Sequence, residues 1–139
     1  MRIVRLILSG ALGASALVGV QILLTDLWLW SAAPAHAYGL MAFVALDVAL
    51  IFGTWIVTRF AVLGALLTAT VQLAAMLGDI IAGEPAGLPV SAFRNYLLAD
   101  MAYLGLLTTQ GFIMAIAIGT WALPHMHGHW LASLKTSRK

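Results

Sequence analysis

Four long apolar stretches, separated by short polar segments, run along the chain at about residues 3–24, 38–57, 60–82 and 96–123. A helix that crosses a bilayer needs about 20 mostly apolar residues, and each stretch meets that length. None shows the period-two alternation of a membrane β-barrel strand. The pattern predicts an all-α integral membrane protein, in which residues 1–139 form a single four-helix transmembrane bundle with short loops and a basic tail, 124–139.

The breaks between the stretches support this division. All four prolines, at positions 34, 85, 89 and 124, fall between the apolar stretches or at their ends, where they interrupt no helix. The first stretch follows Arg2 and Arg5 as a signal peptide would, but it is longer than the roughly 7–15 residues of a signal core. We therefore interpret it as the first membrane helix.

Composition points to the same class of protein. The 139 residues are 63% hydrophobic and only 9% charged, which is too little polar surface for a soluble domain. Cysteine is absent, so disulfides and thiolate chemistry are excluded. The formal net charge is only +2, and most of the basic residues lie near the termini, so we expect no nucleic-acid binding.

The basic residues predict an orientation. Six of the seven lie on one side of the predicted membrane, before the first stretch, between the second and third, or after the fourth, and Arg94 alone lies on the other. The positive-inside rule then predicts a multi-pass protein of the cell membrane with both termini in the cytoplasm.

Small residues recur at every fourth position in each stretch, which places each set along one helix face. Such faces let helices approach closely in a bilayer, so we expect them to form the contacts of the bundle. The sets are Ala11, Ser15 and Gly19; Ala45, Ala49 and Gly53; Ala61, Ala65 and Ala69; and Gly111, Ala115 and Gly119.

Polar residues near the middle of the stretches are the candidates for function. Asp47, Gln72 and Gln110 occupy a similar depth, which predicts a hydrogen-bonded layer, and Thr54 shares the helix face of Asp47. A carboxylate at the bilayer centre costs roughly 2.5–3.5 kcal/mol on insertion scales, and no Lys or Arg of the chain lies at that depth. We expect a neutral Asp47 that pairs with Gln72 or Gln110, or an Asp47 that meets a basic residue or cofactor of another subunit. A proton-carrying or ligand-binding role is the alternative.

The segment LPHMHGHW offers the second candidate site. His125, His127 and His129 at alternate positions would share one side of an extended segment, and imidazoles suit zinc, copper or nickel. No carboxylate or cysteine accompanies them, so the three are weak metal candidates and a polar helix end is the simpler interpretation. His36 lies on the opposite side, which argues against a bis-histidine haem within the chain.

Neither a phosphate-binding loop nor a nucleophile–base arrangement is present, so we predict no catalytic residue and no enzymatic activity of the chain alone. We also expect no cofactor bound by the chain alone, and contact with lipid or a quinone. The chain is similar, at the level of its fold, to small accessory subunits of respiratory and other energy-converting complexes. The leading hypothesis is a non-catalytic subunit whose partners are other integral membrane subunits and lipids.

The rival hypothesis is a small proton-coupled transporter or channel that uses Asp47. The chain has the helix count of small multidrug transporters. Those proteins depend on an acid in their first helix, and the first stretch here carries none in its core.

Overall fold

The computed structural model describes residues 2–83 and 89–136 of the chain, with side chains described as far as 121. The described residues are almost entirely helical, and four of the helices are long and apolar enough to cross a membrane, as predicted. The helices are α1 (Arg2–Thr25), α2 (Leu27–Ala32), α3 (Pro34–Ile56), α4 (Thr58–Ala82), α5 (Val90–Ala99) and α6 (Met101–Thr136).

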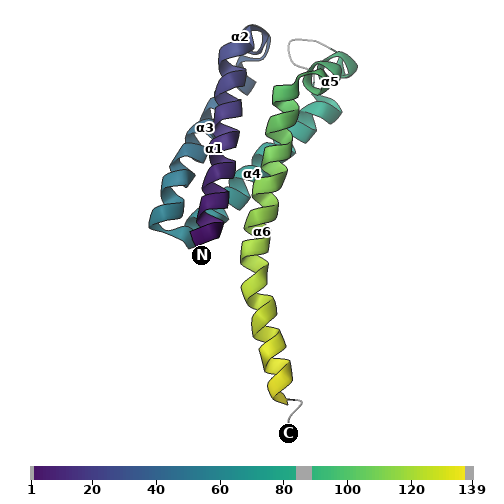
Figure 1. The fold of residues 1–139 in the computed structure, drawn as a ribbon. Coiled ribbons are helices and arrows are strands. Elements are labelled where there is room, and N and C mark those ends of the chain that lie inside the picture. Colours follow the sequence, from purple (N-terminus) through teal and green to yellow (C-terminus); the bar gives the residue numbers. More distant parts are fainter. Residues whose placement is uncertain (1, 84–88, 137–139) are drawn as a thin grey trace.

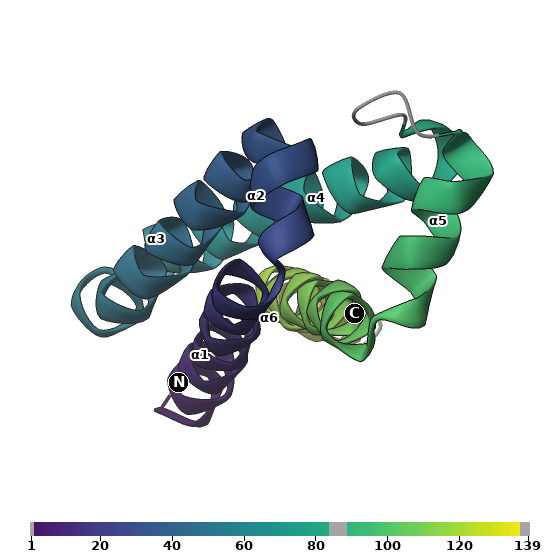
Figure 2. The ribbon, with the colours of Figure 1, turned by 90° about the horizontal axis from the view of Figure 1, so that it is seen from above.

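The long helices form a bundle in which α1 and α4 each pack against both α3 and α6. The short helices α2 and α5 lie together at one end of the bundle, and the start of α1 lies at the other end (Figure 1). Seen from above, α4 runs obliquely from the side of α3 to α5 (Figure 2). The end of the bundle that carries α2 and α5 is called the capped end below.

Single residues separate several helices, and their chemistry explains the breaks. Asp26 ends α1 and caps α2, because its side chain accepts a hydrogen bond from the backbone N–H of Leu29. Pro34 begins α3, where its missing N–H costs no helical hydrogen bond. Val57 alone lies between α3 and α4, at the turn where the sequence offered neither Gly nor Pro.

The fourth expected helix differs most from its predicted bounds. The stretch 96–123 is divided at Asp100, so its first residues belong to α5 and the rest to α6. Asp100 accepts a hydrogen bond from the backbone N–H of Ala102 and so begins a new helix. The backbone of α6 then continues to Thr136, beyond the expected end near 123. Pro124 accordingly lies inside a helix and not at its end.

Two of the four small-residue faces form contacts as predicted. The sets on α1 and α4 are buried, and Gly19 of α1 comes so close to α3 that an added Cβ would lie 2.5 Å from Cγ2 of Val44. The sets on the other two helices form fewer contacts than predicted. On α3, an added Cβ at Gly53 would lie 3.4 Å from Cβ of Ala61, but Ala45 and Ala49 are exposed. On α6, Ile113 and Ala117 are buried instead of Ala115.

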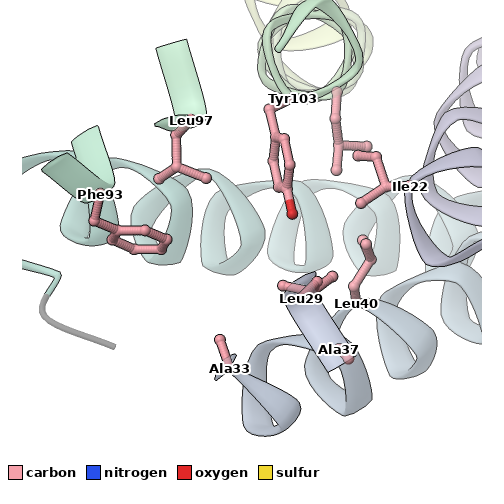
Figure 3. Packing of buried hydrophobic residues seen from close by; sticks show 9 residues of the cluster. Ile22, Leu29, Ala33, Ala37, Leu40, Phe93, Leu97 and Tyr103 are labelled. Carbon is pink, nitrogen blue, oxygen red and sulfur yellow. The ribbon is translucent and has the colours of Figure 1, made fainter. Parts of the chain in front are cut away.

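The buried side chains form two apolar clusters. The cluster near the start of α1 joins α1, α4 and α6, and includes Leu8, Leu12, Val62 and Ile113. The cluster at the capped end gathers side chains from α1, α2, α3, α5 and α6. In it, the Tyr103 side chain extends from α6 toward Leu29 and Leu40 (Figure 3). Ser15 of α1 and Gln110 of α6 lie between the residues that their helices contribute to the two clusters.

Candidate functional site

Asp47 lies inside the bundle, only 1% exposed, and is held by two other helices. The Ser15 hydroxyl of α1 donates a hydrogen bond to Oδ2 of Asp47 over 2.5 Å. Nε2 of Gln110, on α6, donates to the oxygen of the same hydroxyl over 2.6 Å. The acid therefore has its partner within this chain, and Ser15, Asp47 and Gln110 form a buried polar layer. We use that name for these three residues below.

Ser15 is the member of the polar layer that the sequence did not single out. Its place among Ala11 and Gly19 marks it as a packing residue, although a serine is also a donor and an acceptor. Because Asp47 and Gln110 are on helices that both pack against α1, a hydroxyl on α1 can reach both. Oδ1 of Asp47 and Oε1 of Gln110 have no hydrogen-bond partner among the described residues.

Thr54 belongs to a second contact between α1 and α3. Its hydroxyl lies 2.8 Å from the hydroxyl of Ser9 and 2.7 Å from the backbone carbonyl of Ile51, to which it donates. Thr54 is fully buried, two turns along α3 from Asp47. The helix face that carries Asp47 and Thr54 is thus the face by which α3 packs against α1.

Gln72 does not join the polar layer, contrary to the expectation of a layer with Asp47 and Gln110. It is buried, with 3% of its surface exposed, but lines a cavity of about 380 Å³ between α3, α4, α5 and α6. Its side-chain Oε1 has no hydrogen-bond partner among the described residues.

The cavity is mainly apolar and lies towards the capped end. Its walls come from five helices and include Leu29, Gly39, Phe43, Ala75, Met76, Phe93, Leu97 and Leu106. Besides Gln72, the polar side chains that line it are His36, Asp79 and Tyr103. Neither Asp47 nor Ser15 lines it, so the polar layer and the cavity are separate features.

His36 and Asp79 form an ion pair or hydrogen bond across the cavity wall, with Nε2 of His36 3.1 Å from Oδ1 of Asp79. His36 lies in the first turn of α3 and Asp79 in the last turn of α4, and the rings of His36 and Phe93 form a T-shaped pair. This pair was not predicted from the sequence, because the two residues are 43 positions apart. The one signal in the sequence is the spacing of Gln72 and Asp79, which are seven residues apart and therefore on one face of α4.

A third polar group, formed by Asp26, Tyr96 and Tyr103, ties the capped end together. The hydroxyls of both tyrosines donate hydrogen bonds to Oδ2 of Asp26, that of Tyr103 over 3.0 Å. Burial, followed by the hydrogen bond to Asp26, raises the pKa of Tyr96 above its ordinary value. Tyr103 is also buried in the apolar cluster of the capped end.

The three histidines near the end of the chain, His125, His127 and His129, lie outside the residues whose side chains are described. Their backbone is helical as part of α6 and not extended. Among the described residues, no group of three or more His, Cys, Asp or Glu side chains is placed to hold a metal ion.

The described residues thus offer a buried polar layer, which holds three helices together, and an apolar cavity with a few polar groups, which has the character of a binding site. Comparisons with protein-family models, with curated proteins and with solved structures found no match to this chain.

Proposed function

We propose that this protein is a non-catalytic subunit of a larger membrane assembly, and that α3 packs against a transmembrane helix of a neighbouring subunit. The observation that carries the proposal is an uncovered row of alanines on α3. Ala42, Ala45 and Ala49 lie on one side of the helix, and all three are exposed. We call this row the alanine face.

The alanine face has the character of a helix–helix contact. Small side chains let the backbones of two membrane helices approach closely, which is the main source of their association in lipid. The chain itself uses such faces on α1 and α4 for its own packing. Of the four long helices, α3 is also the least covered: 11% of its most apolar window is buried, against 39% for α1.

The polar layer supports a structural role for Asp47. Ser15 donates a hydrogen bond to its carboxyl group, Gln110 donates in turn to Ser15, and Asp47 does not line the cavity. The competing proposal, a proton-coupled transporter or channel, requires a path from water to Asp47. Under our proposal, Asp47→Asn lowers the stability of the protein and changes no proton flux in vesicles.

For the type of assembly we propose a respiratory or other electron-transfer complex, by analogy with small accessory subunits of that architecture. We also propose that both termini lie in the cytoplasm. The distribution of Lys and Arg supports this orientation, since six of the seven lie on the predicted cytoplasmic side.

Cross-linking tests the partner. The chain has no cysteine, so Ala49→Cys and Val48→Cys each introduce a single thiol, on adjacent exposed positions of α3 that point about 100° apart. Each variant is labelled in native membranes with a maleimide photo-cross-linker, and the adducts are identified by mass spectrometry. We expect Ala49→Cys to link to a different membrane protein, and Val48→Cys to give far less of the same adduct.

Extraction in a mild detergent completes the test. Co-purification of the cross-linked partner with haem- or flavin-bearing subunits, seen by absorption spectroscopy, would support the electron-transfer assembly. Adducts with lipid alone, or with a second copy of this chain, would contradict the proposed neighbouring subunit.

A further inference from the structure

We infer that the cavity beside Gln72 binds a small, flat apolar molecule that carries a hydroxyl group, of the phenol or quinol type. This inference does not depend on the proposed neighbouring subunit, because the cavity and the alanine face share no residue. The cavity volume of about 380 Å³ is within the range of roughly 300–1,000 Å³ that is usual for small-molecule sites.

Gln72 indicates the polar part of the ligand. Its side chain is almost fully buried and lines the cavity, yet Oε1 has no hydrogen-bond partner among the described residues. Burying a polar group without a partner is unfavourable, so a ligand that donates a hydrogen bond there gains more than one that cannot. A carboxamide also offers N–H donors, and a hydroxyl group is both a donor and an acceptor.

The walls indicate the rest of the ligand. Phe43 and Phe93 contribute aromatic rings, and Met76 contributes a flexible thioether that adapts to irregular shapes. A flat ring matches such walls, whereas a sugar or an ion would lose its hydration against them without replacement.

His36 and Asp79 line the cavity at some distance from Gln72. Asp79 follows Gln72 by two turns of α4, or about 10 Å along the helix axis. The pair lies 3.1 Å apart and lines the cavity, so a second oxygen on the ring has a donor and an acceptor within the same site. This arrangement favours a ring with polar groups at both ends over a purely apolar one.

Gly39 is the position at which a substitution can fill the cavity. It lines the cavity, and a Cβ added to it meets no atom within 4 Å. The first carbon of a side chain thus has room at this position, and a leucine is introduced there to fill the site. Gly78 is a matched control, since it is also helical and also has nothing within 4 Å of an added Cβ, but does not line the cavity.

The experiment compares two probes, one with a hydroxyl group and one in which a methyl group replaces the hydroxyl hydrogen. The purified full chain in lipid nanodiscs is titrated with 2-naphthol and with 2-methoxynaphthalene, and binding is followed by naphthalene fluorescence, with empty nanodiscs subtracted. We expect 2-naphthol to bind about tenfold more tightly, because only it can donate to Gln72. Gln72→Leu should remove this preference. Gly39→Leu should weaken binding of both probes at least tenfold, and Gly78→Leu should bind as the wild type does.

Circular dichroism and the thermal midpoint of each variant establish that it is folded. If Gln72→Leu fails to fold, comparison of Gly39→Leu with Gly78→Leu still shows whether the probes bind in the cavity. Equal binding of both probes to all the folded proteins would mean partition into lipid only, and would overturn the inference. Binding at the cavity without preference for the hydroxyl would overturn the assigned ligand class.

Discussion

The hydroxyl of Ser15 donates a hydrogen bond to Oδ2 of Asp47 across the contact between α1 and α3, over 2.5 Å. It also accepts one from Nε2 of Gln110 on α6. The Ser15 side chain thus connects three helices at the level of Asp47, the acid near the middle of the second apolar stretch. The arrangement makes the acid a part of the bundle's own packing.

Replacing Ser15 by alanine should therefore destabilise the bundle. The change removes two hydrogen bonds and leaves the buried polar atoms of Asp47 and Gln110 without partners. We expect the free energy of unfolding, measured by SDS titration in mixed micelles, to fall by about 1–2 kcal/mol.

Thr70→Ala is the control for Ser15→Ala, because Thr70 is exposed on α4 and donates only to a backbone carbonyl of its own helix. It should change the free energy of unfolding by less than about 0.5 kcal/mol. A double-mutant cycle of Ser15→Ala and Asp47→Asn isolates the contact. Strictly additive effects would mean that the two side chains do not interact in the folded protein.

Gly19 should tolerate no side chain. An added Cβ would lie 2.5 Å from Cγ2 of Val44 and 3.5 Å from Cδ1 of Leu40, so either the Val44 side chain would have to move or α1 and α3 would have to separate. We expect Gly19→Ala to lower the free energy of unfolding by about 1–3 kcal/mol. Gly10→Ala, on the same helix but with nothing within 4 Å of the new Cβ, should not lower it.

A second substitution tests whether the close approach of Gly19 to Val44 causes the loss of stability. Because the clash is with Val44, the double variant Gly19→Ala, Val44→Ala should recover part of the lost stability. If Val44→Ala instead adds to the loss in full, the close approach at Gly19 is not what destabilises the single variant.

Alkaline pH should loosen the capped end through Tyr96. The pKa of Tyr96 in the folded protein is raised above its ordinary value of about 10, mainly by burial and then by Asp26. A raised pKa means that the folded state holds the proton more tightly. The stabilisation is thus complete below about pH 10 and is lost as the pH rises from there towards the folded-state pKa.

We expect the free energy of unfolding of the wild type to fall as the pH is raised above about 10, and that of Tyr96→Phe to fall less steeply. Tyr38→Phe is the matched control, since Tyr38 is exposed and should keep the wild-type profile. If the free energy of unfolding depended on pH in the same way in all three proteins, groups other than Tyr96 would cause its loss at alkaline pH.

Asp26 should matter more than an ordinary helix cap. It caps α2 through the N–H of Leu29 and accepts hydrogen bonds from both Tyr96 and Tyr103. We expect Asp26→Ala to lower the free energy of unfolding by about 2–3 kcal/mol and to speed hydrogen exchange in α2 and α5. Asp100→Ala removes a comparable contact with the backbone N–H of Ala102, without tyrosine partners, and should cost only about 1 kcal/mol. Equal losses in the two variants would show that the tyrosines add nothing.

Local features of the sequence were enough for the four long helices, because each apolar stretch is long enough on its own to cross a bilayer. They also indicated Asp47, Thr54, Gln72 and Gln110 as unusual, since polar groups inside such stretches need partners. The short helices α2 and α5 were missed. Their ends depend on single capping residues, Asp26 and Asp100, within sequence that otherwise continues an apolar run.

Which polar residues meet was decided by the tertiary structure alone. Asp47, Gln72 and Gln110 share a depth, but depth does not specify which helices are neighbours. Because α1 packs against both α3 and α6, Ser15 lies between Asp47 and Gln110, whereas Gln72 on α4 faces the cavity. Length and hydropathy are properties of each segment, and so the chain determines its spans locally. The polar layer, the cavity and the His36–Asp79 pair depend on how those spans pack, which only the folded bundle decides.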